Sequence, residues 1–342
     1  MTHKNTVGFL GGKYLPLHQG HIYMMLESSN LVDELFVVLS SSKNRDKELC
    51  AREGIKYIPA EVRLAWLGQA LNDVSNAKII HIEDDQWNHN YDWKQGANMI
   101  KEAIGKPIDF VFSSEKSYDE HFKKYYPCAK HVVVDDKRKT VTISATDLRK
   151  NLYDHWDKLP NCVRSHFTKK IAIVGTESCG KSTLTKKLAK FYNTNHVHEV
   201  GRDYCEKYSN QLTVEMFDQI GMDHYLLQKS QAEKSNKVLL VDSDAVITQY
   251  YLDMYFQGHK SQLVEEIVKK QDFDLMIYLE PDIPWVKDGL RFAGEQETRK
   301  KNNQILKQMY TDRGIDFVSI NGTYSERFKK SRTLIDNLFE TK

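Results

Sequence analysis

The sequence predicts an α/β protein of two domains, each built on a parallel β-sheet. Short apolar runs rich in β-branched and aromatic residues alternate with segments of helical periodicity along most of the 342 residues, a pattern typical of doubly wound sheets. The alternation stops once, around residues 150–168, and then starts again. At roughly 150 residues per domain, the length also favours two domains, each large enough to bury its own core.

The first series contains five expected strands. They are VGFL (7–10), LFVVLS (35–40), KIIHI (78–82), DFVFS (109–113) and HVVVD (131–135). Between them, helical periodicity is clearest over residues 60–71, where Val62, Leu64, Leu67 and Leu71 recur. Ligands of such sheets bind beyond the carboxyl ends of the strands. The turn that follows residues 7–10 is therefore a candidate site.

The second series begins after a segment without strong strands, in which Pro160 interrupts helical residues. We expect the boundary near residue 165, with domains at 1–164 and 165–342. The strands expected beyond it are KIAIVG (170–175), HVHEV (196–200), KVLLVD (237–242), DLMIYLE (274–280) and FVSIN (317–321), and long helices are expected at 213–235 and 296–312. This second unit has the size of a nucleotide kinase.

Composition excludes several classes of protein. The net charge is +2 and acidic residues are interleaved with basic ones, which argues against a nucleic-acid-binding patch. The five cysteines form no C-x-x-C and their odd number argues against a disulfide framework. The first apolar run is too short for a signal peptide, and no run of 18 apolar residues exists. We expect a cytoplasmic protein that binds neither nucleic acid nor membranes.

The first candidate site is GGKYLPLHQGH (11–21). Gly11 and Gly12 carry no side chains, so a ligand can approach the backbone there. His18 and His21 stand where the first strand hands over to a helix, whose N-terminus offers N–H donors and a positive dipole end. Imidazoles there can stabilise charge on phosphate oxygens. The alternative is a pair of histidines that caps a surface helix.

A second stretch near the end of this domain, ISATDLRKN (143–151), has the same character. Ser144 and Thr146 lie at an expected helix start, and the fork of donors on Arg149 could hold a pyrophosphate. Taken alone, the stretch could also be an ordinary N-cap with a solvated arginine.

The third motif, GTESCGKST (175–183), fits the phosphate-binding loop G-x-x-x-x-G-K-[ST] between an apolar strand and a helix. In such a loop the backbone N–H groups cradle the phosphates, Lys181 reaches the β- and γ-phosphate oxygens, and Ser182 ligates Mg²⁺. The residues expected to bind the nucleotide are Gly175, Glu177, Ser178, Cys179, Gly180, Ser182 and Thr183. The alternative is a purely structural turn.

Polar residues follow three further strands of the second series. Asp242 in VDSD is placed like a Walker-B acid, near Mg²⁺ or the attacking hydroxyl. HEVGRDY (198–204) offers Glu199, Arg202 and Asp203 for hydrogen bonds to a ribose. The loop PWVKDGLRFAG (284–294) has the character of a phosphate-covering lid, in which Asp288 would contact substrate and Arg291 would stabilise the transferring phosphoryl group. NGTYSERF (321–328) is a candidate adenine loop. Each stretch alone could be an exposed helix cap.

GGKYLPLHQGH and ISATDLR together resemble the H-x-G-H nucleotidyltransferase superfamily, with its Rossmann-like domain. GKYLPLHQGHIYM is most similar to the nicotinamide mononucleotide adenylyltransferase domain of bifunctional NadR-type proteins, and VFSSE (111–115) resembles that family's nucleotide-binding segment, which includes Ser113. The resemblance implies that the 5′-phosphate of nicotinamide mononucleotide attacks the α-phosphorus of ATP, helped by Mg²⁺, and that pyrophosphate leaves. It places His18 and His21 at the ATP phosphates.

The same resemblance assigns further roles in this domain. Lys13 sits where many relatives have arginine, and should also serve the phosphates. Ser144, Thr146 and Arg149 should bind the β- and γ-phosphates. The nicotinamide ring needs an aromatic partner, for which Trp87 and Trp93 in DDQWNHNYDWKQG (84–96) are candidates; core tryptophans at the sheet edge are the alternative.

The motifs GTESCGKST, HEVGRDY, VDSD and PWVKDGLR resemble the ribosylnicotinamide kinase domain of the same family. The loop motif alone predicts only a nucleoside-triphosphate-dependent kinase or ATPase. The resemblance implies nicotinamide riboside as substrate, so that a kinase would feed an adenylyltransferase which completes NAD. The small-molecule partners implied are nicotinamide riboside, nicotinamide mononucleotide, ATP and NAD, with Mg²⁺ as cofactor. The sequence leaves room for a homo-oligomer.

Three rival functions remain. Some family members carry an N-terminal helix-turn-helix domain and repress transcription, but here the first strand begins near residue 6, so an NAD-sensing DNA-binding regulator is not expected. A metabolite sensor that no longer catalyses is disfavoured by intact His18, His21 and Arg149. An adenylyltransferase for another phosphate acceptor, such as phosphopantetheine, is disfavoured by the kinase-like second half.

Overall fold

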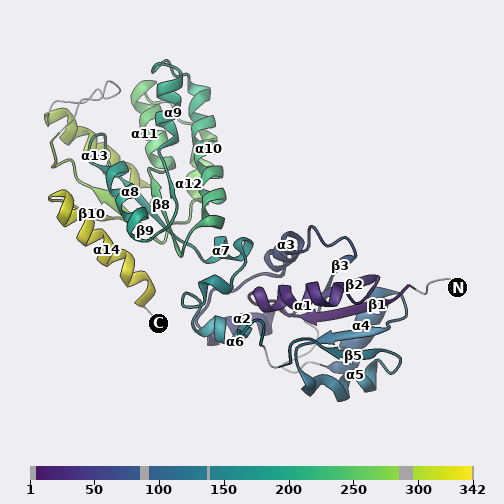
Figure 1. Cartoon of the computed structure of the whole chain (residues 1–342). Helices are drawn as coiled ribbons and strands as arrows, with labels where there is room; N and C mark the ends of the chain where they lie inside the picture. Colours follow the sequence, from purple (N-terminus) through teal and green to yellow (C-terminus); the bar gives the residue numbers. More distant parts are fainter. Residues whose placement is uncertain (1–4, 85–91, 137–138, 285–295, 341–342) are drawn as a thin grey trace. The chain divides into compact units, whose positions relative to one another are not determined.

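The computed structural model describes residues 5–84, 92–136, 139–284 and 296–340. It divides the chain into two compact units, Met1–Val163 and Arg164–Lys342 (Figure 1). Each unit has its own parallel sheet, as the sequence predicts.

The sheet described in the first unit consists of five parallel strands in the order β3-β2-β1-β4-β5. These are β1 (Val7–Gly12), β2 (Glu34–Ser41), β3 (Ala77–Glu83), β4 (Phe110–Ser113) and β5 (Lys130–Val133). The chain builds outward from β1 to β3 on one side and then crosses to β4 on the other, so β1 and β4 are adjacent. A ligand crevice is expected at such a switch point, beyond the carboxyl ends of β1 and β4.

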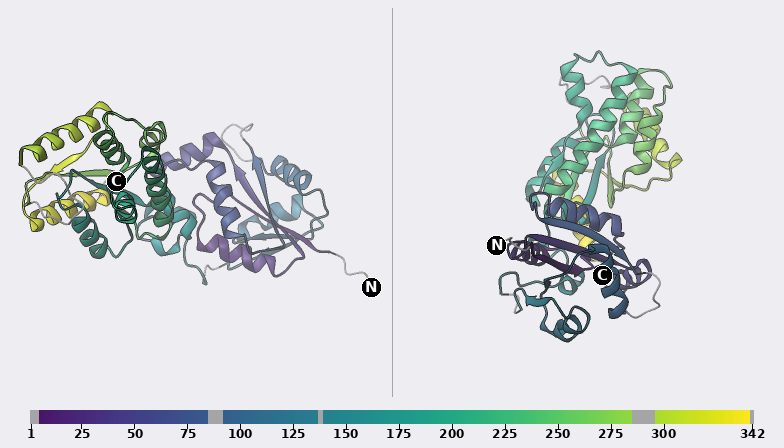
Figure 2. Two further views of the ribbon diagram at one scale, coloured as in Figure 1. Left: turned by 90° about the horizontal axis from the view of Figure 1, so that it is seen from above. Right: turned by 90° about the vertical axis from the view of Figure 1, so that its right-hand side faces the viewer.

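Helices cover both faces of this sheet (Figure 2). On one face, Phe9, Val38 and Val111 pack against Ala97 and Ile100 of α4. Helices α1 and α3 contact β2. The described helices of this unit are α1 (Gln19–Ser29), α2 (Lys43–Arg52), α3 (Ala60–Ala70), η1 (Lys116–Tyr118), α4 (Trp93–Ile104), α5 (Asp119–Tyr125), α6 (Ala145–Lys150) and η2 (Trp156–Lys158); α7 (Asn161–Phe167) contains the division between the units.

In the described part of the second unit, the sheet also consists of five parallel strands, in the order β10-β9-β6-β8-β7. These are β6 (Lys169–Val174), β7 (His196–Val197), β8 (Val238–Asp242), β9 (Leu275–Leu279) and β10 (Val318–Ile320). The strand expected at 196–200 is shorter than predicted, because Glu199 is the N-cap of a helix that starts at Val200. The residues of HEVGRDY therefore lie mostly on a helix.

Two helical layers enclose this second sheet. On one face, Leu184 and Leu188 of α8 and Ile335 of α14 pack on β6 and β8; on the other, Val246 of α11 and Leu306 of α13 pack on β6 and β9. The described helices are α8 (Lys181–Phe191), α9 (Val200–Lys207), α10 (Val214–Lys234), α11 (Ala245–Tyr255), α12 (Gln262–Lys270), α13 (Gln296–Asp312) and α14 (Tyr324–Glu340). Of the helices described in both units, none is long and apolar enough to span a membrane.

Candidate functional site

The two histidines of the first motif lie together at the carboxyl end of β1. His18 is the buried N-cap of α1, and its Nδ1 accepts a hydrogen bond from the Gly20 N–H at 3.1 Å. Because Nδ1 accepts, the proton of a neutral His18 ring resides on Nε2. The rings of His18 and His21 stack with their centroids 3.7 Å apart. The helix start therefore holds both imidazoles as one unit.

The ISATDLR segment lies beside the same loop. Ser144 is the N-cap of α6, where its hydroxyl accepts from the Asp147 N–H at 3.1 Å. Arg149 donates from Nη1 to the carbonyl oxygen of Leu15 at 2.9 Å and from Nη2 to the Thr146 hydroxyl at 3.0 Å. Two motifs that are 134 residues apart are thus joined by one guanidinium. Burial lowers the pKa of Arg149, yet arginine stays charged at neutral pH.

Lys13 takes part in a buried charge cluster that sequence reasoning missed. Its ammonium lies 2.5 Å from Asp46 Oδ1, and Arg63 Nη2 lies 2.7 Å from Asp46 Oδ2. Arg63 Nη1 also donates to the Lys13 carbonyl at 2.8 Å. The side chains of Asp46 and Arg63 are completely buried, whereas that of Lys13 is 43% exposed. A phosphate bound by Lys13 would therefore share its ammonium with Asp46.

Ser113 ends β4, next to β1, and its hydroxyl lies in a hydrogen-bonded chain. Ser113 Oγ is 2.8 Å from His131 Nε2, and His131 Nδ1 is 3.1 Å from Asp119 Oδ1. A carboxylate only accepts, so His131 donates from Nδ1 to Asp119, while the Ser113 hydroxyl also donates to the Glu115 carbonyl at 3.0 Å. Hydrogen bonds from Lys123 and His131 lower the pKa of Asp119. The nucleotide-binding role of Ser113 stays a prediction.

The remaining residues predicted for this site are two glycines at the end of β1 and two tryptophans. Gly11 and Gly12 are the last residues of β1, and a Cβ added at Gly11 would meet no atom closer than 3.9 Å. Trp93 begins α4 and stacks on His121, with ring centroids 4.3 Å apart. Trp87 lies outside the described residues.

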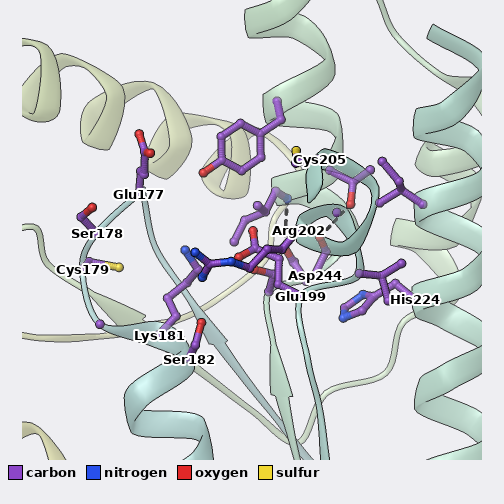
Figure 3. Close-up of a pocket in the computed structure, with 18 of the residues that line it drawn as sticks. Glu177, Ser178, Cys179, Lys181, Ser182, Glu199, Arg202, Cys205, His224 and Asp244 are labelled. Carbon is purple, nitrogen blue, oxygen red and sulfur yellow. Dashed lines mark hydrogen bonds between the residues drawn. The ribbon is translucent and has the colours of Figure 1, made fainter. Parts of the chain in front are cut away.

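The second unit contains a cavity of about 350 Å³ above the carboxyl ends of β6 and β8. Its lining comes from residues 177–183 of the Gly-rich loop, residues 199–202 at the start of α9, and side chains of α10 and α11. In Figure 3 the loop residues line one side, His224 lies on the opposite side, and Glu199 and Arg202 lie between them. The loop and the start of α9 therefore face one space.

The geometry of the loop is that of a phosphate cradle. Gly175 has φ +142°, and a Cβ added there would lie 2.6 Å from the Leu279 carbonyl oxygen. Lys181 is the first residue of α8 and donates to the Thr176 carbonyl at 3.1 Å. Burial disfavours its ammonium, but the nearby carboxylates of Glu199 and Asp242 favour it, and the pKa of Lys181 is raised overall. The buried lysine is thus charged. Burial raises the pKa of Cys179, which keeps this thiol unreactive.

Asp242 ends β8 and is almost fully buried beside the loop. Burial, with the charge of Glu199, raises the pKa of Asp242 to about 6, although Lys181 and a hydrogen bond with Ser182 act against the shift. Asp242 Oδ1 has no hydrogen-bond partner among the described residues. A hydroxyl and a carboxylate oxygen in need of a partner form a donor set suited to a hard cation. No group of three or more His, Cys, Asp or Glu in the described parts of the chain could hold a metal by itself.

The three residues predicted for the ribose do not share one environment. Glu199 and Arg202 line the cavity, and Arg202 Nε lies 3.3 Å from Glu206 on the next turn of α9. The Asp203 side chain is 57% exposed and lies 2.6 Å from His198 Nε2, and Asp203 is not among the residues that line the cavity. Asp288 and Arg291 lie outside the described residues.

Sequence reasoning missed the part of the cavity that long helices provide. Burial lowers the pKa of His224 to about 4, so this ring is neutral at pH 7. Burial raises the pKa of Asp244 to about 6; this residue caps α11 and accepts from the Tyr310 hydroxyl at 2.8 Å. The lining residues missed on α10, on α11 and between β8 and α11 are Phe217, Ile220, His224, Ser243, Asp244, Ile247, Thr248 and Tyr251. Of these, only Ser243 and Asp244 carried a signal, because they belong to VDSD (241–244) at a strand end, and an ordinary helix cap would give the same signal.

Comparison with known proteins fits this division of the chain. Residues 9–151 match the cytidylyltransferase-like family and residues 170–327 match an AAA domain family. The trifunctional NAD biosynthesis/regulator protein NadR of Escherichia coli (strain K12) is 31% identical, over 97% of this chain and 83% of that protein. The protein of the same name from Salmonella typhimurium (strain LT2) is 30% identical, over 98% and 84%.

Solved structures agree on the fold. A crystal structure of NadR protein in complex with NR has a TM-score of 0.81 at 23% identity, and covers 99% of this chain and 98% of its own. A second, of NadR protein in complex with NAD and AMP-PNP, has a TM-score of 0.78 at 22% identity, covering 99% and 97%. With two relatives at 30% identity or more over nearly its whole length, the chain belongs to the NadR family.

Proposed function

We propose that the protein phosphorylates nicotinamide riboside with ATP and then adenylylates the resulting nicotinamide mononucleotide with a second ATP, which yields NAD and pyrophosphate. One observation supports the proposal: two separate strand-to-helix turns, each with the residues expected of a phosphate site and each at the carboxyl end of the central strand of its own sheet, lie in one chain of the NadR family. Both relatives are named as NAD biosynthesis proteins.

In the first unit, the reaction needs positioning and charge stabilisation rather than a protein nucleophile. An oxygen of the mononucleotide 5′-phosphate attacks the α-phosphorus of ATP, and the bond to the bridging oxygen of pyrophosphate breaks. His18 would donate to the phosphates from Nε2, the nitrogen that carries the proton of its neutral ring. Arg149 and Lys13 supply positive charge, and Ser144, Thr146 and Ser113 supply hydroxyls.

In the second unit, the 5′-hydroxyl oxygen of nicotinamide riboside attacks the γ-phosphorus of a second ATP, and ADP leaves. Lys181 and the loop N–H groups would hold the phosphates. The cavity beside the loop would hold the riboside, with Glu199 and Arg202 as polar partners and with Phe217 and Tyr251 as apolar walls. A cavity of about 350 Å³ has the size of small-molecule sites.

We propose that Ser182 and Asp242 hold Mg²⁺ together with phosphate oxygens. The unpartnered Asp242 Oδ1 beside the Ser182 hydroxyl fits such an ion. When bound, Mg²⁺ neutralises charge on the β- and γ-phosphates. We also propose that the domains are residues 1–164 and 165–342 and that the protein acts in the cytoplasm, where its five free cysteines would stay reduced.

Product analysis tests the proposal. Purified protein given nicotinamide riboside and Mg-ATP should produce first the mononucleotide and then NAD, both separable by chromatography. If neither product forms with Mg²⁺ present, the enzymatic assignment is wrong. If NAD forms only from supplied mononucleotide, the kinase half of the proposal is wrong.

A further inference from the structure

An arginine of NGTYSERF (321–328), the stretch predicted above as an adenine loop, touches the backbone of the Gly-rich loop instead. Arg327 lies in the first turn of α14, 148 residues after Cys179, and is only 2% exposed. Its Nη1 donates to the Cys179 carbonyl oxygen at 2.6 Å. Its Nε donates to the Gly322 carbonyl at 2.7 Å, and its Nη2 to the Glu280 carbonyl at 2.8 Å. Nη2 also forms an ion pair with Asp282.

The start of α14 is built to hold this arginine in place. Thr323 and Glu326 form a capping box, in which the Glu326 carboxylate accepts from the Thr323 N–H at 2.8 Å and the Thr323 hydroxyl accepts from the Glu326 N–H at 3.3 Å. The Gly322 N–H donates to Asp282 Oδ2 at 2.7 Å. The turn before α14 is thereby tied to the segment after β9, and Arg327 is tied to both.

The contact with Cys179 controls the direction of a loop donor. The peptide bond is planar and trans, so the carbonyl of Cys179 and the N–H of Gly180 point in opposite directions. A guanidinium that holds this carbonyl on one side of the loop therefore fixes the Gly180 N–H on the other. Gly180 is the N-cap of α8, directly before Lys181. We propose that Arg327 is a positioning residue that aims the Gly180 N–H at the phosphates of ATP, an inference that rests on the proposed kinase function.

Packing around Gly180 supports this assignment independently of the hydrogen bonds. Gly180 has φ +89°, and a Cβ added there would meet Ile283 and Tyr324 side-chain atoms, both at 3.2 Å. Ile283 and Tyr324 belong to the two segments that Arg327 joins. The loop is thus clamped at one residue by side chains from both segments, while Arg327 holds the adjoining carbonyl.

The chemistry of the contact explains why arginine is present. A buried guanidinium surrounded by three carbonyls and one carboxylate is costly compared with an apolar residue of similar volume. Its rigid, planar fork holds several acceptors in fixed directions, which a lysine ammonium on a flexible stem does not. Arg327→Lys keeps the charge and removes this directional control.

The chain offers a matched control. Arg313 is 20% exposed, pairs with Glu265 through Nε at 3.2 Å and through Nη2 at 2.5 Å, and donates from Nη1 to the Met309 carbonyl at 2.8 Å. It binds a carboxylate and a carbonyl as Arg327 does, but these partners lie in α12 and α13 rather than in the loop. Arg313→Lys therefore measures how much stability and kinase activity this unit loses when an arginine that does not contact the loop is replaced by lysine.

The test compares full-length wild type, Arg327→Lys and Arg313→Lys. For Arg327→Lys we expect kinase kcat/KM for ATP to fall about 10- to 100-fold. This loss is smaller than the roughly 10²–10³-fold loss that follows complete removal of a charge-stabilising donor. The rate of adenylyl transfer should stay within about twofold of wild type. Arg313→Lys should lower the melting temperature comparably but keep kinase kcat/KM within about twofold. Equal losses of kinase activity in both variants would overturn the inference.

Hydrogen exchange separates this inference from the proposed function. Mg-ADP should slow amide exchange in peptides covering residues 176–184 of wild type, and less so in Arg327→Lys; equal protection in the two proteins would overturn the inference. If Mg-ADP protects these amides in wild-type protein that does not phosphorylate nicotinamide riboside, only the assignment of nicotinamide riboside as the kinase substrate would be refuted. If Arg327→Lys does not fold, Asp282→Asn, which weakens one of the four contacts, should lower kinase kcat/KM several-fold, and an unchanged value would overturn the inference.

Discussion

We expect Asp46→Asn to destabilise the unit Met1–Val163 by about 3–5 kcal/mol, the usual cost of leaving a buried charge without its partner. Asp46 lies 2.7 Å from Arg63, and both side chains are completely buried, so water cannot replace the lost carboxylate around the guanidinium. Lys13, at 2.5 Å, is 43% exposed and can turn to solvent. Its pair with Asp46 should therefore contribute only about 0–1 kcal/mol.

Urea unfolding followed by tryptophan fluorescence measures this effect selectively, because four of the five tryptophans precede residue 164. The matched control is Asp46→Asn combined with Arg63→Met, which removes both buried charges and should recover most of the stability. A loss below about 1 kcal/mol for Asp46→Asn would refute the reasoning, as would a double variant no more stable than the single one. Kinase activity should stay within about twofold, since each unit has its own core.

Three further predictions concern the two sites. His21→Ala should lower adenylyl transfer by about 10²–10³-fold, the scale for one lost charge-stabilising donor, and leave phosphorylation of nicotinamide riboside within a few-fold; equal loss of both activities in product assays would indicate misfolding. Lys181→Ala should lose the kinase step but still make NAD from supplied mononucleotide. A mixture of Lys181→Ala and His21→Ala should make NAD from nicotinamide riboside, because the mononucleotide can diffuse from one protein to the other. A mixture that makes mononucleotide but no NAD would show that the intermediate does not exchange. Asp242→Asn should abolish kinase activity yet stabilise the protein by about 1–3 kcal/mol at pH 7. The raised pKa of Asp242, about 6, means that the folded state binds the proton more tightly. As the pH rises from about 4 to 6, the free energy of unfolding of the wild type should therefore fall relative to that of Asp242→Asn in urea titrations. Parallel pH profiles of the two proteins would contradict this.

The parts of the sites that could be predicted from the sequence are those whose chemistry is local. The Gly-rich loop and the H-x-G-H turn join a strand to a helix within a few residues, so spacing alone reveals them. Alternation of strands and helices similarly predicts both sheets, apart from the short β7, where the capping role of Glu199 outweighs the β propensity of the surrounding residues.

The parts that could not be predicted depend on contacts between distant elements. Asp46 stands in the charged stretch KNRDKE, which has the composition of a solvated helix, and only folding brings it to Arg63 in the next helix. His224 and Phe217 occur in α10 with spacing that suits core packing equally well. Arg327 lies in a helix whose charged residues have the composition of a solvated surface, yet it is the largest of the fully buried side chains described in its unit.

The glycines of the two motifs differ in how much variation they would tolerate, although a motif search scores them alike. At Gly175, an added methyl group would collide with the backbone of β9, which cannot move aside, so any substitution there should reduce the amount of folded protein in a cell. At Gly11 an added methyl group would make only ordinary van der Waals contact, with the Val38 carbonyl at 3.9 Å. An alanine there should therefore leave the amount of folded protein unchanged and lower only the binding of nucleotide. A variant survey that selects for abundance and for growth on nicotinamide riboside separately would thus sort these positions into those required by the fold and those required by the ligand.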